Sequence, residues 1–305
     1  MALLVQCGQC RLDSRIDSVL QELEGSAVGS ATLRQLLTHS SGLPGWRGFY
    51  EQLSPNAVLP SSLEARAGAG RRVVHMIAKE TLVYGMGERS LYSDLGFMLL
   101  GLAIERLSGI PLDRFVREHI IQPLNAQTLC FLPTDSEGES HKNSMIRSVA
   151  PTEQDSWRGR LVCGEVHDEN AAALGGVAGH AGLFGTAEAV LAVTGAWLAA
   201  YHNKPSILNS DVVLDFSKRQ LQIPGSSWAI GWDTPSPPSS SGRYFSSQSF
   251  GHLGYTGTSI WIDPVRELEV VLLSNRVHPT RKNDGIRAYR PMIHDLVYQE
   301  YAQVC

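Results

Sequence analysis

Three short segments of the chain carry side chains whose chemistry suits proton transfer. Tyr92 and Asp94 flank a serine, and His252 lies between a glycine and a leucine in residues 251–258 (GHLGYTGT). Residues 37–44 (LTHSSGLP) add an imidazole among hydroxyl groups. Phenol, imidazole and carboxylate groups are the side chains that general acid–base catalysis uses. These segments are therefore the first candidates for an active site.

Each segment also has a structural interpretation. Tyr92 can pack on the core where a helix begins, and Asp94 suits a first helical turn because the helix dipole favours a carboxylate there. His252 can be a hydrogen-bonded loop residue. His39 and the serines that follow it favour a turn, because their side chains can cap backbone groups. The functional interpretation therefore depends on which other motifs occur in the same chain.

The elements that would position these segments are helical in the first two thirds of the chain and strand-rich near its end. The spacing of apolar residues predicts helices over 12–23, 32–38, 94–107, 111–121, 186–201 and 284–302. It predicts a hairpin of two strands over 256–263 and 267–274, with polar loops over 134–157 and 234–249. No linker divides the chain. We expect one domain over 1–305, with a helical lobe roughly over 30–200 and sheet strands with a closing helix roughly over 226–305.

Composition excludes several classes of protein. The 305 residues carry 26 basic and 30 acidic side chains without a basic run, so neither nucleic acid nor an anionic membrane is the expected partner. No apolar stretch reaches the roughly 18 residues that span a bilayer. The first residues, MALLVQCGQCRLDSR, lack the basic start of a signal peptide. We expect a cytoplasmic protein that binds a small ester, amide or peptide.

The triplet His167-Asp168-Glu169 is the one sequence that suggests a metal site. Adjacent residues in regular structure cannot all point at one ion, and no second cluster of ligands is evident. We therefore expect no metal and no cofactor, and we interpret His167, Asp168 and Asn170 as residues of a cleft wall or braces of a loop.

Four segments together resemble the serine β-lactamase and penicillin-binding-protein-like hydrolases, in the branch of class C-like enzymes, D-alanyl-D-alanine peptidases and related esterases. They are LLTHSSGLPGW at 36–46, YSDLGFMLLGLAIERLSG at 92–109, GEVHDENAAALGGVAGHAGLFGTAE at 164–188 and GHLGYTGTSIWIDP at 251–264. The resemblance implies an α/β (α+β) fold. In it an antiparallel sheet is flanked by helices, and the site lies between the sheet and an all-helical lobe.

The resemblance also implies roles for individual residues in acyl transfer. Tyr92 would shuttle a proton, Asp94 stands where asparagine is more usual, His252 would line the cleft, and the Tyr255 N–H would face an oxyanion. The remaining implied substrate-binding residues are Gly254, Thr256, His167, Asn170 and His180. Leu253 replaces the usual threonine, whose hydroxyl would contact a substrate carboxylate.

The family's nucleophile belongs to a Ser-x-x-Lys motif, which places both side chains on one helical face. Only five lysines occur, and none has a serine three positions before it; the residues found there are Met76, Glu139, Tyr201, Asp215 and Pro279. We interpret MALLVQCGQCRLDSRI as the tail of the nucleophile helix, with the N-terminal strands missing. Ser41 as a replacement nucleophile is the weaker alternative.

Two functions remain open at this point. The chain is expected to be a β-lactamase-related serine hydrolase by resemblance, inactive as it stands, or a catalytically silent homologue or fragment that binds a ligand. Loss of the N-terminal strands would leave the strand over 267–274 as an exposed apolar edge, which favours self-association.

Overall fold

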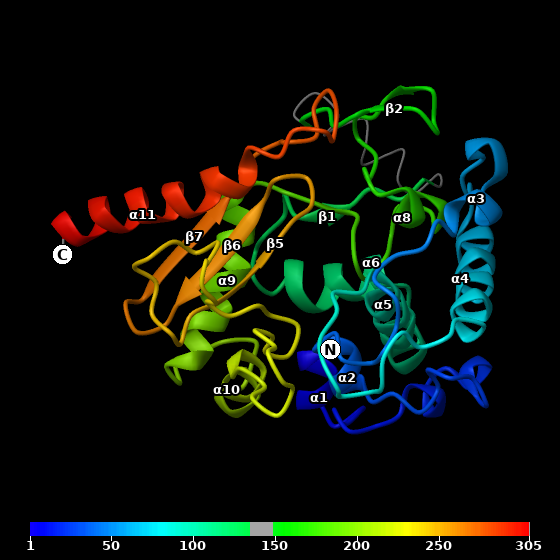
Figure 1. Ribbon diagram of the computed structural model, residues 1–305, viewed down its shortest axis with the longest axis horizontal. Coiled ribbons are helices and arrows are strands. Elements are labelled where there is room, and N and C mark those ends of the chain that lie inside the picture. The colour runs from blue at the N-terminus through cyan, green and yellow to red at the C-terminus, as the bar shows by residue number, and fades with distance from the viewer. Residues whose placement is uncertain (135–148, 305) are drawn as a thin grey trace.

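A small antiparallel sheet and a helical lobe lie side by side in the computed structural model, which describes residues 1–134 and 149–304 (Figure 1). The sheet has three strands in the order β5-β6-β7: Phe250–Leu253, Ser259–Asp263 and Leu268–Leu272. Asp263 pairs with Leu268, so β6 and β7 form the predicted hairpin. The motif with His252 forms a strand of its own, β5, which the sequence analysis did not predict.

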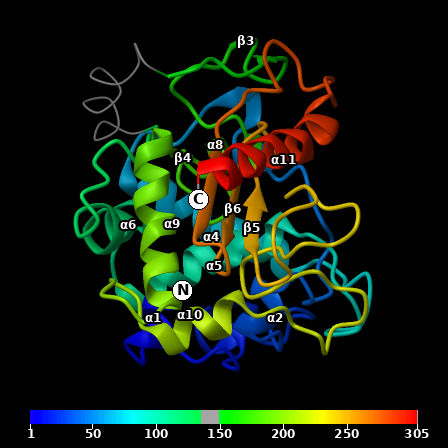
Figure 2. The ribbon, with the colours of Figure 1, turned by 90° about the vertical axis from the view of Figure 1, so that its left-hand side faces the viewer.

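Two helices pack on this sheet. Helix α9 (Ala187–Tyr201) runs along the sheet beside β7, and α11 (Ile286–Val304) crosses above the strands (Figure 2). Phe250 and Trp261 fill the space between the layers and are almost completely buried. Within residues 1–134 and 149–304 no strand pairs with the outer side of β7. The predicted edge is thus present, and self-association through it stays a prediction.

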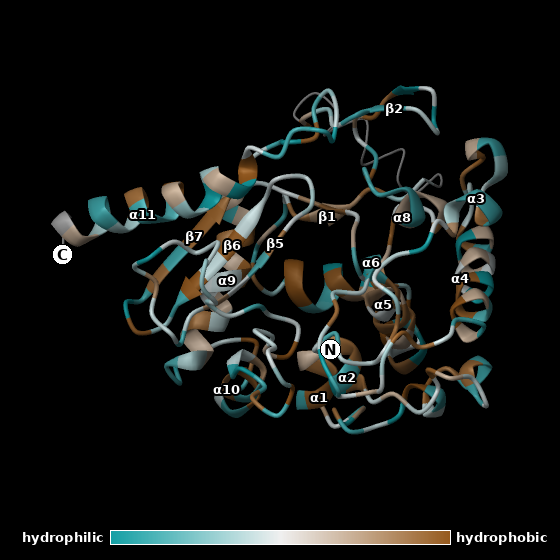
Figure 3. Cartoon of the chain, in the orientation of Figure 1, coloured by the Kyte–Doolittle hydropathy of each residue, from teal (hydrophilic) through white to brown (hydrophobic). Residues whose placement is uncertain are grey.

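The helical lobe is built around α5 (Asp94–Ser108). Helices α2 (Leu33–Leu37) and α4 (Leu63–Ala78) contact it, and Leu95 and Leu99 of α5 are fully buried. Much of α5 is coloured hydrophobic in Figure 3. Ser93 caps α5 by accepting a hydrogen bond from the Gly96 N–H, and Gly109 ends it in a left-handed conformation. In the part of the chain described here, no single helix is long and apolar enough to cross a membrane; α5 and the following helical segment meet that test only as a pair bent by 75°.

Short elements connect the two parts and place the loops around them. They are α1 (Ala2–Gln6), η1 (Ile16–Ser18), η2 (Gln21–Leu23), α3 (Tyr50–Leu53), η3 (Pro55–Ala57), α6 (Leu112–Val116), η4 (Arg117–Ile121), β1 (Cys130–Phe131), β2 (Gln154–Asp155), β3 (Arg160–Leu161), α8 (Glu169–Ala173), β4 (Leu183–Phe184) and α10 (Ser210–Ser217). The predicted loop 134–157 lies partly outside the described residues, and its last residues form β2.

The predicted helix over 12–23 is wrong. Two short 3₁₀ turns stand in its place, although Ile16, Leu20 and Leu23 are buried as the periodicity required. The Ile16 N–H donates to Ala31 O at 2.8 Å and the Asp17 N–H donates to Gly29 O at 3.1 Å. These bonds to a later segment replace the hydrogen bonds that an α-helix would make within itself.

A glycine-rich strip, residues 175–185, crosses α5 and ends at β4. Glycines recur at every third position of this strip, 176, 179, 182 and 185, and a Cβ at any of them would lie within 2.8 Å of a neighbouring atom. At Gly179 it would lie 2.1 Å from the backbone oxygen of Phe97, the fourth residue of α5. The missing side chains thus let the strip lie directly on the helix and fix the residue that follows, His180.

Candidate active site

An aromatic cluster joins the helical lobe to the sheet. It consists of His39, Tyr92, Trp228 and His252, and it brings together one residue from each of the three candidate segments. The ring centroids of Tyr92 and His252 are 6.2 Å apart, and Trp228 contacts both rings, at 5.9 Å and 5.6 Å. Tyr92 precedes α5 and remains 45% exposed, so its phenol is accessible from outside the cluster.

His39 forms the floor of this cluster. Its φ of 54° matches the predicted turn, and its Nδ1 accepts a hydrogen bond from the Ser93 N–H at 3.1 Å, so the proton of the neutral ring is on Nε2. Burial, followed by the charge of His252, lowers the pKa of His39 to about 3. The Nε2–H lacks a hydrogen-bond acceptor among the described residues, and the Trp228 ring lies edge-on at 4.4 Å. The ring therefore stays neutral and holds Tyr92 by packing.

Burial also keeps the proton-carrying groups of the cluster neutral. It raises the pKa of Tyr92 far above its usual range, helped by the charges of Asp94 and Asp168. It likewise raises the pKa of Asp94 and lowers that of His252. Tyr92 therefore carries its proton at neutral pH and His252 lacks the second one, which suits a proton donor beside an acceptor.

A partly buried ion pair joins Asp168 to His180. His180 Nε2 and Asp168 Oδ1 are 2.9 Å apart, and Asp168 also caps α8 by accepting from the Ala171 N–H at 2.7 Å. Burial opposes both charges, yet the pair and its hydrogen bonds lower the pKa of Asp168 and raise that of His180. His180 also interacts electrostatically with Asp94, and this interaction favours the charged form of each.

The turn after β5 carries Gly254, Tyr255 and Thr256. The Tyr255 N–H makes no hydrogen bond to the rest of the described chain, which leaves it free for a ligand. A Cβ on Gly254 would lie 2.0 Å from Thr258 Oγ1, so only glycine fits there. The Tyr255 ring is 59% exposed, with the Arg276 guanidinium 4.2 Å from its centroid and the His167 ring stacked on it at 5.9 Å.

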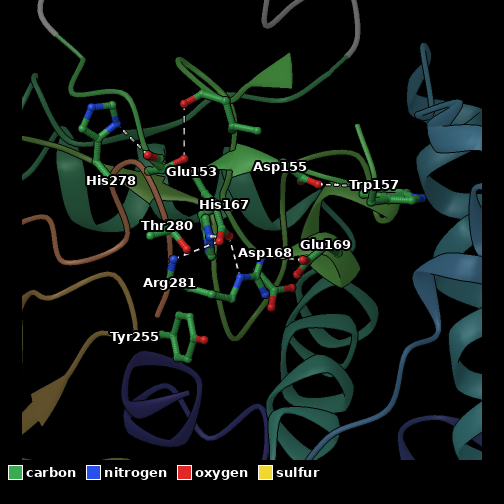
Figure 4. Close-up of polar contacts among 12 residues, drawn as sticks. Glu153, Asp155, Trp157, His167, Asp168, Glu169, Tyr255, His278, Thr280 and Arg281 are labelled. Carbon is green, nitrogen blue, oxygen red and sulfur yellow. Dashed lines mark hydrogen bonds and ion pairs between the residues drawn. The ribbon is translucent and has the colours of Figure 1, made fainter. Parts of the chain in front are cut away.

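A charged cluster supports the Tyr255 end of the cleft. Glu153 accepts from the Arg281 Nε–H at 2.5 Å and lies 2.9 Å from His167 Nε2, while Arg281 also donates to Glu169 at 2.6 Å (Figure 4). Burial opposes these charges, but the hydrogen bonds from Arg281 and His167 lower the pKa of Glu153. The members of the charged cluster are Glu153, Asp155, Arg158, His167, Glu169 and Arg281.

The residues of the suspected metal triplet point to different partners. His167 turns to Glu153, Asp168 to His180 and Glu169 to Arg281. Within residues 1–134 and 149–304, no three histidine, cysteine, aspartate or glutamate side chains form a metal-binding group.

Asn170 lies away from the open surface of the cleft. It is 1% exposed, and its side-chain amide accepts from the Tyr50 N–H at 2.9 Å and donates to Arg47 O at 2.8 Å. It thus braces the loop before α3. The Thr256 carbonyl is likewise engaged and accepts from the Arg276 N–H at 2.8 Å.

Several residues of the site escaped the sequence analysis. Trp228, Glu153, Arg276 and Arg281 lie in segments without periodicity or a motif, and the fold alone brings them to the cleft. His39 was predicted only as part of a turn. A lone histidine in a Ser/Thr-rich turn gives no signal for an aromatic cluster that forms with residues 53 and 189 positions away.

Comparison with known proteins identifies the family of the chain. The Beta-lactamase family model matches residues 1–290. A protein of Escherichia coli (strain K12) named "Putative D-alanyl-D-alanine carboxypeptidase" is 32% identical over 267 residues, which are 82% of this chain and 58% of that protein. A protein of the same name from Salmonella heidelberg is 30% identical over 261 residues, with the same shares. The chain thus spans less than two thirds of the length of these relatives.

Solved structures show the same fold. Simvastatin synthase (LovD) from Aspergillus terreus has a TM-score of 0.67 at 19% identity, covering 99% of this chain and 81% of its own. A beta-lactamase from Mycobacterium bovis has a TM-score of 0.60 at 21% identity, covering 98% of this chain and 81% of its own. The predicted mixed α/β fold and the predicted resemblance are both confirmed. The chain belongs to the beta-lactamase family.

Proposed function

We propose that the chain forms the acid–base and oxyanion side of an acyl-transfer site, which binds a small ester or amide. The observation that carries this proposal is the 6.2 Å approach of Tyr92 and His252, two residues from distant motifs. The free Tyr255 N–H two positions after the strand supplies a hydrogen-bond donor for a ligand carbonyl. A protonated phenol, a neutral imidazole and a backbone donor together suit the binding and polarisation of a carbonyl group.

Turnover needs a nucleophile as well as these groups. A Ser-x-x-Lys pair would attack the carbonyl, and residues 1–305 contain no such pair. These residues supply binding, the neutral proton carriers and the oxyanion donor. We therefore expect the 305-residue chain to bind acyl ligands and to leave them intact.

The ligand class follows from the strand motif. The names of the relatives point to peptides that end in D-alanine, which carry a carboxylate. Leu253 brings an apolar side chain to the position that would contact this carboxylate, and Arg276 and Arg290 beside the turn already donate to backbone carbonyls. An uncharged ester or amide therefore suits this cleft better than a free carboxylate.

A titration tests the proposed binding. The ¹⁵N-labelled chain is titrated with N-acetyl-D-Ala-D-Ala and with its methyl ester, while the Tyr255 amide and the Trp228 indole are followed by NMR. We expect both signals to move, with the methyl ester binding more tightly. Leu253→Thr should reduce the difference in Kd between the free acid and the methyl ester. Leu221→Thr, which substitutes an 80% exposed leucine, should leave that difference unchanged. If neither ligand moves a cleft signal, the proposed function is wrong.

A second measurement concerns the nucleophile. The chain is incubated with a fluorophosphonate probe and with a chromogenic cephalosporin, and the protein is analysed by mass spectrometry. We expect no serine adduct and no turnover. A stoichiometric adduct on a serine would show that these residues hold their own nucleophile, and Ser41 would be the first position to substitute.

A further inference from the structure

The turn at residues 254–258 is tied down through its carbonyl groups. Arg290 Nη2 donates to Gly254 O at 2.6 Å and to Thr258 O at 2.7 Å. Arg276 Nε donates to Tyr255 O at 2.7 Å, and Ser274 Oγ donates to Gly257 O at 2.6 Å. All of these donors come from the segment after β6, and the Gly257 N–H within the turn also donates to Gly254 O at 3.1 Å.

The bond from Arg290 to Gly254 O bears directly on the free N–H of Tyr255. The two groups belong to one peptide unit, which is planar and trans, so its C=O and N–H point in opposite directions. Fixing the carbonyl therefore fixes the direction of the N–H. The Gly254 peptide cannot shift easily in response, because Thr258 Oγ1 already occupies the space where a Cβ would lie.

Arg290 is well placed to hold this peptide firmly. It lies on α11, its residue is 7% exposed, and one guanidinium nitrogen bridges both ends of the turn. A hydrogen bond from a cation to a carbonyl polarises the amide, which makes the N–H at its other end a stronger donor. The arginine thus both aims and strengthens the Tyr255 N–H without touching a ligand.

We propose that Arg290 is a positioning residue that sets the direction and donor strength of the Tyr255 N–H toward a bound carbonyl. This inference rests on the proposed function of the cleft. The inference makes the closing helix α11 part of the site, although no side chain of this helix would contact the ligand. Arg276 supports the next peptide in the same way by holding Tyr255 O.

The test uses the full chain and three variants. Arg290→Met removes the charge and the two bonds, Arg290→Lys keeps the charge, and Arg287→Met removes an exposed arginine from the same helix as the matched control. The first readout is the ¹H–¹⁵N shift of the Tyr255 amide without ligand. The second is the Kd of the methyl ester of N-acetyl-D-Ala-D-Ala, measured on the same samples.

We expect Arg290→Met to move the Tyr255 amide signal upfield and to weaken ester binding about tenfold, as for the loss of a single well-made hydrogen bond. Arg290→Lys should recover part of both effects, and Arg287→Met should show neither. A purely structural arginine would lower the thermal midpoint in both Arg290 variants while the Tyr255 signal and the Kd stayed at their wild-type values. That result overturns the inference.

The two proposals can fail separately. If the wild-type chain does not bind the ester, the proposed function fails, and the ligand-free Tyr255 shift still decides whether Arg290 orients the peptide. If Arg290→Met does not fold, Arg290→Lys carries the comparison: an unchanged Tyr255 shift and an unchanged Kd in that folded variant contradict the inference.

Discussion

The two ends of the cleft wall are stabilised in opposite ways. In the aromatic cluster, burial suppresses charge: His39 has a pKa of about 3, and that of Tyr92 lies far above its usual range. In the charged cluster, buried ions face one another, with Asp155 and Arg158 3.0 Å apart and both side chains 2% exposed. The rings of the aromatic cluster are neutral, and the His180–Asp168 pair is the charged contact near them. The charged cluster lies at the Tyr255 end, where His167 stacks on the Tyr255 ring.

The largest loss of stability should come from a substitution in the charged cluster. Asp155→Ala would leave the Arg158 guanidinium buried without its partner and remove the acceptor of the Trp157 and Arg158 N–H groups. We expect a loss of about 3 kcal/mol in the free energy of unfolding, measured by urea denaturation. Arg160→Ala, which breaks an ion pair with an arginine side chain 49% exposed, should cost less than about 1 kcal/mol. Equal losses of unfolding free energy in the two variants would contradict the role of Asp155 as the buried partner of Arg158.

The aromatic cluster should differ in its response to acid. The folded pKa of His39, about 3, lies below the usual value near 6.5, so the unfolded chain binds the extra proton first. Stability from this group is complete above the usual value and falls by up to about 1.4 kcal/mol per pH unit as the pH drops from about 6.5 toward 3. Glu153 also has a lowered pKa, but its contribution is complete above the usual carboxylate value and is lost only below it.

His39→Asn tests this difference. Asparagine tolerates the left-handed backbone and keeps an acceptor for the Ser93 N–H. We expect the acid slope between about pH 6 and pH 4 to become shallower in the variant, as followed by urea unfolding at several pH values, while His252, whose pKa is also lowered, keeps its own part of the slope. His75→Asn, at an exposed position of α4, should keep it. An unchanged slope in His39→Asn would show that the ring is not held neutral.

The smallest effect on stability should come from Tyr92. Tyr92→Phe removes a hydroxyl from a side chain that is 45% exposed, so the free energy of unfolding should change by less than about 0.5 kcal/mol. Binding of the acyl ester should weaken, because the proposed function makes the Tyr92 phenol a hydrogen-bond donor to the ligand. A variant with wild-type affinity would remove Tyr92 from the proposed binding site and leave its packing role intact.

The parts of the site that could be predicted from the sequence are the ones carried by local motifs. Tyr92 and Asp94 flank the serine that caps a helix, and His252 stands in a glycine-rich motif, so these residues could be identified from their own neighbours. Trp228 and Arg290 could not, because their importance comes from residues that only the fold brings near. The helix predicted over 12–23 is wrong for the same reason. The spacing of apolar residues indicates which side chains are buried, but it does not indicate which segment accepts the backbone hydrogen bonds.

The glycine-rich strip has a consequence for protein engineering. Positions 175, 176, 179 and 182 each lack room for a single methyl group, whereas Leu183 is 48% exposed. A saturation library over this strip should therefore accept few substitutions at these glycines and at the buried Val177 and Ala178, and many at Leu183. Substitutions at Leu183 should remain compatible with the fold, whereas substitutions at the four glycines should disrupt it.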